Sequence, residues 1–267
     1  MDKAPEIKYN SWNVPKKNGG YRRITAPNQE LKLFQNKIKK DLDLLPIHPA
    51  VHGFVHGRNI MTNASAHLNK DYVLNIDIKN FFPSIKTTKT IEILKNHYRL
   101  KPSLLEEIEK FCFLNGGLPQ GAPTSPVLAN LFMCEMDLIF SHFAKDYGLS
   151  YTRYADDVTF SGSSFLKEGL SQVLSFLDGN LSWYGLLRNF RKTKLMPYYQ
   201  RQLVTGLLVN NHEISIPRKK RDELYFRFKG TKEEDLTVSD KGVLEFVRSV
   251  NIRVYNKIMG TIDHGKI

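Results

Sequence analysis

The chain has 267 residues, of which 41% are hydrophobic and 25% are charged. This balance is that of an ordinary folded protein and argues against intrinsic disorder, and the length suffices for one large domain or for two or three joined subdomains. The net charge of +12 favours a polyanionic partner such as nucleic acid; a merely solubilising surface charge is the alternative.

The cysteines and the N-terminus indicate the compartment. Cys112 and Cys134 both lie in apolar stretches, as expected of buried, reduced thiols, and no Cys-x-x-Cys pair suggests a zinc site. The N-terminal residues contain no apolar core of a signal peptide, and no apolar run reaches the length of a transmembrane helix. We therefore expect a cytoplasmic protein that does not span or contact a membrane.

The pattern of hydrophobic residues and of Gly and Pro predicts the elements in chain order. In the first half they are a turn, strand and loop over residues 12–27, a helix over 28–45, a strand over 72–78, and helices over about 87–97 and 102–113. In the second half they are a helix from Thr124 or Ser125 to about residue 145, a strand, turn and strand over 151–160, a helix over about 165–184, a strand pair at 204–209 and 213–216 that turns at Asn210-Asn211, and a basic helical tail from Pro217. Because hairpins interrupt the alternation of strands and helices, we expect an α+β fold with a mixed or antiparallel sheet.

Three carboxylates are candidates for metal chemistry. Asp156 and Asp157 lie at the tip of a predicted hairpin, and Asp77 lies at the end of an earlier strand. Adjacent carboxylates raise one another's pKa unless a cation offsets them, and their hard oxygen atoms suit Mg²⁺. Two such ions can activate a 3′-hydroxyl and stabilise a leaving pyrophosphate. An Asp pair in a turn is also an ordinary structural feature, because Asp tolerates turn geometry.

The segments around these carboxylates resemble the motifs of reverse transcriptases. Residues 154–157, Tyr-Ala-Asp-Asp, are similar to the Tyr-x-Asp-Asp box of that family. Residues 75–82 resemble its first catalytic aspartate motif, and residues 118–126, which begin Leu-Pro-Gln-Gly, resemble the motif between the two. Each motif alone is moderately specific, whereas three in this order are very specific. The resemblance covers about residues 12–260.

This resemblance implies an RNA-directed DNA polymerase, which is a nucleotidyltransferase, with two Mg²⁺ ions and deoxynucleotide triphosphates as substrates. Asp77 and Asp156 would be the direct metal ligands, Asp157 would support them, and the Ile78 carbonyl would complete a metal site.

The resemblance also implies which residues bind the nucleotide. Phe82 would lie under the incoming sugar and exclude a 2′-hydroxyl, whereas Phe81 is expected to be a core residue. Gln120 would contact the nucleotide, and Gly121 would let the backbone approach closely. On the fingers hairpin, two basic side chains would hold the triphosphate: Lys17 and Arg22, the latter through bidentate binding of phosphate.

Two further segments resemble retron enzymes within this family. Residues 63–67, Asn-Ala-Ser-Ala-His, are similar to their Asn-Ala-x-x-His element, and Val204-Thr205-Gly206 is similar to their Val-Thr-Gly element. The retron resemblance implies a cognate structured noncoding RNA that serves as primer and template, and single-stranded DNA that begins at a guanosine 2′-hydroxyl and stays branched (msDNA). It further implies anti-phage defence with a possible effector or toxin protein.

RNA binding is accordingly expected at three places. These are Asn63 and His67, the segment Val204, Thr205 and Gly206, and the basic segment Arg218, Lys219, Lys220 and Arg221. The alternative for His67 is a structural histidine with satisfied hydrogen bonds, and the alternative for the basic segment is a solvated helix surface.

Other functions remain open from the sequence. The nearest is another bacterial reverse transcriptase, of the defence-associated, diversity-generating or group II intron-like type. Phe82 and Ala155 argue against an RNA-dependent RNA polymerase, and the three intact carboxylates argue against a non-catalytic RNA-binding scaffold. A zinc site at His48, His52 and His56 is rejected, because prolines and glycines between them break any helix that would align them.

The resemblance divides the chain into the parts of a right-hand polymerase. The fingers would comprise residues 1–71 with a helical insertion at 87–117, and the palm residues 72–86 and 118–205. Residues 206–267 would form a small helical thumb that binds RNA.

Overall fold

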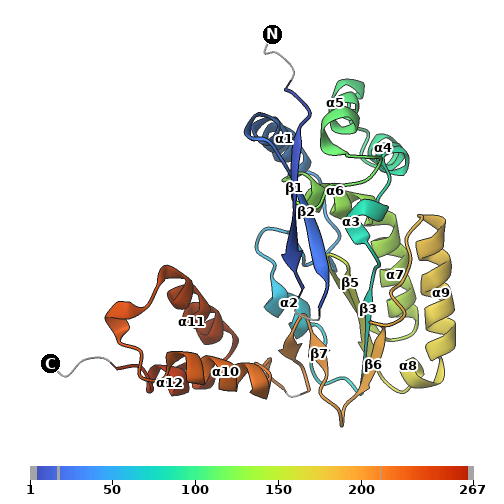
Figure 1. Cartoon of the computed structure of the whole chain (residues 1–267). Coiled ribbons are helices and arrows are strands. Elements are labelled where there is room, and N and C mark those ends of the chain that lie inside the picture. Colours follow the sequence, from blue (N-terminus) through green and yellow to red (C-terminus); the bar gives the residue numbers. More distant parts are fainter. Residues whose placement is uncertain (1–4, 17–18, 211, 264–267) are drawn as a thin grey trace.

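The computed structural model describes residues 5–16, 19–210 and 212–263. Figure 1 shows a main body, which contains the largest sheet and most of the helices, and a helical arm formed by the C-terminal residues beside it. The predicted α+β class with an antiparallel sheet is confirmed.

A four-stranded antiparallel sheet in the order β4–β5–β3–β6 forms the centre of the main body. Its strands are β3 (Tyr72–Asp77), β4 (Ser150–Tyr154), β5 (Asp157–Gly162) and β6 (Lys194–Pro197). The strands predicted at 72–78 and within 151–160 are therefore confirmed. The register between β3 and β5 places Asp77 opposite Asp157, so carboxylates that are distant in sequence meet at one end of the sheet.

Helices rich in aromatic residues pack against this sheet and bury it. They are α6 (Ser125–Phe132), α7 (Cys134–Asp146), α8 (Phe165–Glu168) and α9 (Leu170–Trp183). The ring of Phe140 in α7 lies 5.8 Å from that of Tyr151, 6.2 Å from that of Phe160 and 6.1 Å from that of Phe176, measured between centroids. This aromatic cluster joins α7 and α9 to strands β4 and β5.

Two predicted helices are each broken in the structure. The helix predicted from Thr124 or Ser125 to about residue 145 bends by 50° between α6 and α7. Nearly all of α6 is buried, so the surrounding core rather than a single apolar face sets its direction. The helix predicted over about 165–184 divides at Gly169, where a Cβ would lie 3.0 Å from the Phe165 ring.

The N-terminal segment forms a hairpin over the main body. The strands β1 (Tyr9–Pro15) and β2 (Tyr21–Pro27) pair antiparallel, whereas the sequence predicted one strand with a turn and a loop. Four helices follow the hairpin in this region: α1 (Gln29–Leu42), α3 (Phe81–Ser84), α4 (Thr87–Asn96) and α5 (Pro102–Cys112). The predictions of α1, α4 and α5 are confirmed, and the Asn28 side chain caps α1 by accepting from the Leu31 N–H.

A second, smaller core lies where the main body meets the arm. There α2 (Ile60–Ser65) packs against the hairpin of β7 (Leu203–Val204) and β8 (Leu207–Leu208). This hairpin turns at Thr205 and Gly206, inside the first strand that the sequence predicted. The predicted pairing of 204–209 with 213–216 is present only as an antiparallel bridge, in which the Leu208 and Ser215 N–H groups donate to each other's carbonyl at 2.8 and 3.0 Å. Between these two residues, the Asn210 side chain bonds to the main chain of Tyr198, Gln200 and Gln202, and Asn211 lies outside the described residues.

The C-terminal arm has a core of its own. It contains α10 (Arg218–Phe228), the 3₁₀ helix η1 (Glu233–Asp235), α11 (Val238–Val250) and α12 (Ile252–Met259), which confirms the predicted helical tail. Leu224, Phe228, Val247 and Ile258 are among its buried residues. These side chains form an apolar cluster that is separate from the main core.

No single helix in the described part of the chain is long and apolar enough to cross a membrane. The bent pair α6 and α7 satisfies that criterion only when the two helices are taken together.

Candidate active site

The turn between β4 and β5 carries two of the three candidate carboxylates. It consists of Ala155 and Asp156, and Ala155 adopts a left-handed conformation with φ of 57°. The Asp156 carbonyl accepts a hydrogen bond from the Ile78 N–H at 3.0 Å, which ties the turn to the end of β3. The sheet therefore holds Asp77, Asp156 and Asp157 at one end of its two central strands, as the motifs predicted.

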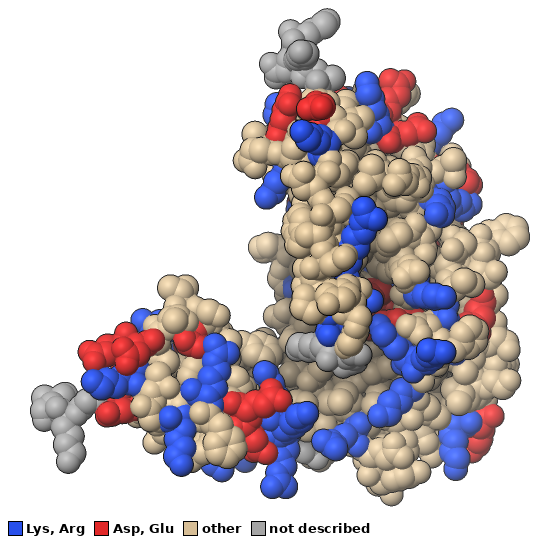
Figure 2. All heavy atoms as spheres, viewed as in Figure 1, with Lys and Arg blue, Asp and Glu red and all other residues tan. Residues whose placement is uncertain are grey.

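A hollow of about 500 Å³ opens beside the carboxylates at this end of the sheet. Asp77 and Asp157 line it on one side, and the other side is formed by the segment from Arg191 to Lys194. Figure 2 shows acidic atoms in a recess that Lys and Arg side chains surround. The hollow thus combines negative groups at its base with positive groups around it, which suits a ligand that carries both metal ions and phosphates.

Two residues that the sequence analysis missed bind the carboxylate of Asp77. Lys192 Nζ lies 2.6 Å from Oδ2, and Asn189 Nδ2 donates to Oδ1 at 2.9 Å. The Asn189 N–H also donates to the Asp77 carbonyl at 2.8 Å. The sequence offered only a weak signal, a density of basic residues between Arg188 and Lys194, because nothing local indicates that this segment pairs with β3.

The pKa values of Asp156 and Asp157 are raised above the ordinary value of an aspartate. Burial, then Asp156 and Asp77, raise the pKa of Asp157 to about 6, and Lys192 opposes them. Burial is also the largest cause that raises the pKa of Asp156, and Asp77 adds to it, whereas Lys192 and Arg22 lower it. Positive charge in the hollow therefore stabilises the ionised carboxylates. As the side chains stand, the ammonium of Lys192 lies on Asp77, and among the described residues no three His, Cys, Asp or Glu side chains form a ready-made metal site. An ion could bind to these carboxylates only if Lys192 and the carboxylate side chains rearranged.

The residues predicted to bind the nucleotide lie on several different segments of the chain. Arg22 is exposed on β2, and its positive charge lowers the pKa of Asp156. Lys17 lies outside the described residues. The Gln120 carbonyl accepts from the Thr25 N–H at 2.8 Å, and a Cβ on Gly121 would lie 3.0 Å from the Thr25 carbonyl. In this structure, the close approach at Gly121 is thus to β2.

Three aromatic residues lie beside the turn between β4 and β5. Phe82 is half-buried, and Phe81 belongs to the core as predicted. The ring of Phe54, a residue that the sequence analysis did not select, lies 6.3 Å from Phe82 and 6.5 Å from Tyr154. Phe54 is 53% exposed and has φ of 61°, an uncommon conformation for a bulky residue.

Burial contradicts direct RNA contact by three residues of the retron-like motifs. His67 is fully buried, with Nδ1 2.6 Å from Ser161 Oγ and Nε2 2.7 Å from Thr152 Oγ1. Asn63 and Val204 are also buried. The alternative of a structural histidine is therefore correct for His67, because neither nitrogen is free to bind RNA.

The two retron-like motifs contact each other instead. Asn63 Nδ2 lies 3.5 Å from Thr205 Oγ1, and that hydroxyl donates to the Ile60 carbonyl at 3.2 Å. From the other side, Asn75 Nδ2 donates to the Leu203 carbonyl at 2.5 Å. The hairpin of β7 and β8 is thus held between α2 and β3. Its contact on β3 is Asn75, which lies two residues before Asp77. Thr205 is half-buried and Gly206 is exposed, so the tip of the turn is the accessible part.

The basic segment lies on α10 of the arm. Arg218, Lys219 and Lys220 are exposed, but Arg218 and Lys220 face acidic residues of the same helix at 3.7 and 3.1 Å. Arg221 is half-buried, and its Nε has no partner among the described residues. A second hollow of about 510 Å³ lies between α10 and α12, lined by Arg218, Arg221 and aromatic residues of α10.

Comparison with known proteins agrees with this geometry. Residues 14–228 match the family model described as reverse transcriptase (RNA-dependent DNA polymerase). The chain is 33% identical to the retron Ec86 reverse transcriptase of Escherichia coli, over 97% of this chain and 81% of that protein. It is 37% identical to the retron Mx162 reverse transcriptase of Myxococcus xanthus, over 76% of this chain and 47% of that protein.

A solved structure shows the same fold. Telomerase from Candida tropicalis, in complex with a TWJ fragment of telomeric RNA, aligns with a TM-score of 0.58 over 95% of this chain and 52% of that chain, at 15% identity. Together with the antiparallel sheet and its carboxylates, this defines a right-hand polymerase. The chain belongs to the reverse transcriptase family, and its relatives make it a retron-type enzyme, an RNA-directed DNA polymerase.

The buried His67 predicts a pH dependence of stability. Burial, followed by Lys70 and His52, lowers its pKa to about 3, so the folded state keeps the ring neutral. The unfolded chain takes up a proton below the ordinary histidine pKa of 6.5, and the free energy of unfolding therefore falls as the pH drops, by up to about 1.4 kcal/mol per pH unit from this residue. Urea denaturation at several pH values between about 7 and 5 should show a shallower dependence for His67→Gln. Equal slopes for the variant and the wild type would contradict the buried neutral ring.

Proposed function

We propose that Asp77, Asp156 and Asp157, at one end of the central strands of the sheet, bind the two Mg²⁺ ions of nucleotidyl transfer. The observation that carries this proposal is the convergence of three carboxylates at one place, which raises the pKa of Asp156 and Asp157. One of the three, Asp77, already pairs with the ammonium group of Lys192. Carboxylate oxygens are the ligands that Mg²⁺ prefers. Asp77 and Asp156 would be direct ligands, with support from Asp157 and the Ile78 carbonyl, and Lys192 would move off Asp77 when an ion binds.

The residues around the carboxylates would orient the substrates. When bound, the metal ions activate the 3′-hydroxyl and stabilise the leaving pyrophosphate. Arg22 on β2 would hold the triphosphate, because a guanidinium binds phosphate bidentately. Gln120 and Gly121 would lie along the nucleotide, and Phe82 would lie beneath its sugar.

The division into subdomains follows from the same proposal. The fingers would comprise residues 1–71 with the helical insertion 87–117, the palm residues 72–86 and 118–205, and the thumb residues 206–267. The separate apolar cluster of the C-terminal arm supports the thumb as a unit. Its basic helix α10 would hold the RNA backbone, with the accessible tip at Thr205 and Gly206 facing the nucleic acid.

The retron relatives support a more specific function. We propose that the enzyme uses one structured noncoding RNA as template and primer, and that DNA synthesis begins at a guanosine 2′-hydroxyl to give branched msDNA. An unactivated 2′-hydroxyl is a poor nucleophile, so placement beside the carboxylate site is the main requirement. Anti-phage defence together with an effector protein would be the biological context.

The catalytic role of the carboxylates is tested by substitution. Asp156→Asn should lower DNA synthesis by about three orders of magnitude, because the variant loses a charged ligand that holds the metal ions. RNA binding measured by filter retention should stay within about twofold. Asp41→Asn, on the exposed face of α1, is the matched control. Undiminished synthesis by an Asp156→Asn, Asp157→Asn double variant would refute the assignment.

The role of Phe82 is tested by sugar selection. Phe82→Ala should open space beside the sugar C2′ and raise ribonucleotide incorporation relative to deoxynucleotide incorporation by about tenfold or more. Single-nucleotide extension of an annealed primer measures this ratio. Trp183→Ala, an exposed aromatic at the end of α9, should leave the ratio unchanged. A ratio equal to that of the wild type would make Phe82 a packing residue only.

Priming distinguishes a retron enzyme from other reverse transcriptases. Nucleic acid that co-purifies with the enzyme should contain RNA joined to DNA through a 2′–5′ linkage, and a debranching enzyme should separate the two. The Asp156→Asn variant should retain the RNA without attached DNA. A linear product that starts only from 3′ ends would leave the polymerase assignment intact but refute retron priming.

A further inference from the structure

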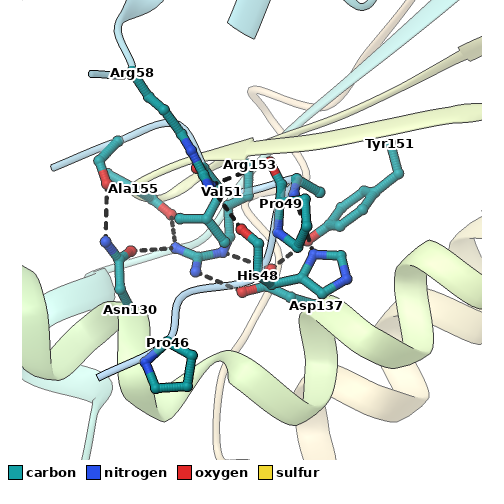
Figure 3. Close-up of polar contacts among 12 residues, drawn as sticks. Pro46, His48, Pro49, Val51, Arg58, Asn130, Asp137, Tyr151, Arg153 and Ala155 are labelled. Atoms are coloured by element: carbon teal, nitrogen blue, oxygen red, sulfur yellow. Dashed lines mark hydrogen bonds and ion pairs between the residues drawn. The ribbon is translucent and has the colours of Figure 1, made fainter. Parts of the chain in front are cut away.

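A buried cluster of charged and polar side chains lies directly beneath the catalytic turn (Figure 3). At its centre is Arg153 of β4, whose side chain is fully buried together with that of Asp137 in α7. Asp137 accepts from Arg153 Nε at 2.8 Å and from Nη2 at 2.7 Å, and it also accepts from the Tyr151 hydroxyl at 2.5 Å. Arg153 is therefore held in one orientation by a bidentate pair.

The remaining nitrogen of this guanidinium points to the turn. Arg153 Nη1 donates to the Ala155 carbonyl at 3.1 Å and to Asn130 Oδ1 at 3.1 Å. Ala155 is the left-handed residue of the turn and directly precedes Asp156. The hydrogen bond thus fixes the peptide group between Ala155 and the candidate ligand Asp156.

Asn130 of α6 extends the cluster to a neighbouring segment. Its Nδ2 donates to the Gly53 carbonyl at 2.9 Å. Gly53 lies so close to the turn that a Cβ there would be 2.5 Å from the Ala155 nitrogen. The turn is consequently held on one side by Arg153 and on the other by the backbone at Gly53.

Arg58 holds this neighbouring segment in place. Its Nη1 donates to the carbonyls of His48 at 2.8 Å and Val51 at 2.6 Å. The segment also runs alongside β4, because the Arg153 N–H donates to the Ala50 carbonyl and the His52 N–H donates to the Arg153 carbonyl, both at 2.8 Å. These hydrogen bonds hold the backbone at Gly53 in a fixed position against the turn.

Stability alone is a weak explanation for such a cluster. A buried ion pair costs desolvation energy that its own attraction often only offsets, so a well-packed apolar pair would serve a core equally well. What the guanidinium adds is geometry, since one planar group bonds to Asp137 and to the turn simultaneously. Left-handed Ala155 needs support of this kind, because that conformation is strained for a residue with a Cβ.

We propose that Arg153, held by Asp137 and Asn130, is a positioning residue that sets the catalytic turn in the geometry needed for the carboxylates to bind divalent cations. This inference rests on the proposed role of Asp156 and Asp157 as metal-site residues. Arg153 acts through the Ala155 peptide group and touches neither substrate nor ion.

Two variants separate positioning from folding. Arg153→Lys keeps a positive charge beside Asp137 but has no second nitrogen that reaches the Ala155 carbonyl. Asn130→Leu keeps the side-chain volume, leaves the pair of Arg153 and Asp137 intact, and removes the bridge to Gly53. Thr152→Val is the matched control, because Thr152 is buried on the same strand and bonds to His67, away from the turn.

The measurement is Mn²⁺ binding to the purified protein, followed by electron paramagnetic resonance, with melting temperature and steady-state extension kinetics recorded on the same samples. We expect Arg153→Lys and Asn130→Leu to weaken Mn²⁺ binding by about tenfold or more and to lower kcat similarly, as for other supports of metal sites. The KM for the deoxynucleotide should change by less than about twofold. Thr152→Val should lower the melting temperature without changing Mn²⁺ affinity.

The outcomes separate this proposal from the one on which it rests. If folded Arg153→Lys and Asn130→Leu bind Mn²⁺ and turn over as the wild type does, and only their melting temperatures fall, the cluster is structural and the inference is overturned. The metal assignment itself is checked independently with Asp156→Asn, which should abolish the strongest Mn²⁺ binding. Binding that Asp156→Asn leaves intact would refute the proposed metal site whatever the Arg153 variants show.

Discussion

Asp77, Asp156 and Asp157 carry like charges at one end of an antiparallel sheet, and such charges raise the free energy of the folded state unless positive groups offset them. In the structure this offset comes from Lys192 and, at longer range, from Arg22. Lys192 lies on the segment before β6, and Arg22 lies on β2 of the N-terminal hairpin. The electrostatic requirement thus connects parts of the chain that are distant in sequence.

The same requirement explains why the surroundings of the site are so firmly built. A carboxylate that repels its neighbours moves away from them when the backbone permits it, so the backbone must be fixed. The register of β3 and β5 fixes Asp77, and the bond from the Ile78 N–H fixes the Asp156 carbonyl. Main-chain hydrogen bonds and the buried guanidinium of Arg153 thus keep three carboxylates together although their charges repel.

Local patterns predicted much of this fold, and the exceptions have physical causes. The strand that carries Asp77 and the helices α1, α4 and α5 follow from hydrophobic periodicity, which is a local property. No proline or glycine marks the bend between α6 and α7 in the sequence. The direction of α6 is set instead by tertiary contacts, because nearly all of its residues are buried. The tight turn at Thr205 and Gly206 was missed because Asn210 is the stronger turn signal; around Asn210 the predicted pair is reduced to the bridge between Leu208 and Ser215.

The site was predictable where motifs carry it and not where tertiary contacts complete it. The three carboxylates were selected from their motifs alone. Lys192 follows Asp77 by 115 positions and reaches it only because β6 pairs with β3. For His67, the motif indicated importance but not its cause, since the hydroxyls of Thr152 and Ser161 that bury it belong to strands far along the chain.

One half-buried side chain, Val250 at the end of α11, packs against both the apolar cluster of the C-terminal arm and the cluster formed by α2 and the hairpin of β7 and β8. A small apolar contact of this kind can slide or separate at little energetic cost, so relative motion of the two units is the ordinary expectation. Motion at this contact would move the basic helix α10 relative to the carboxylates, while the register of β3 and β5 keeps Asp77 and Asp157 opposite each other.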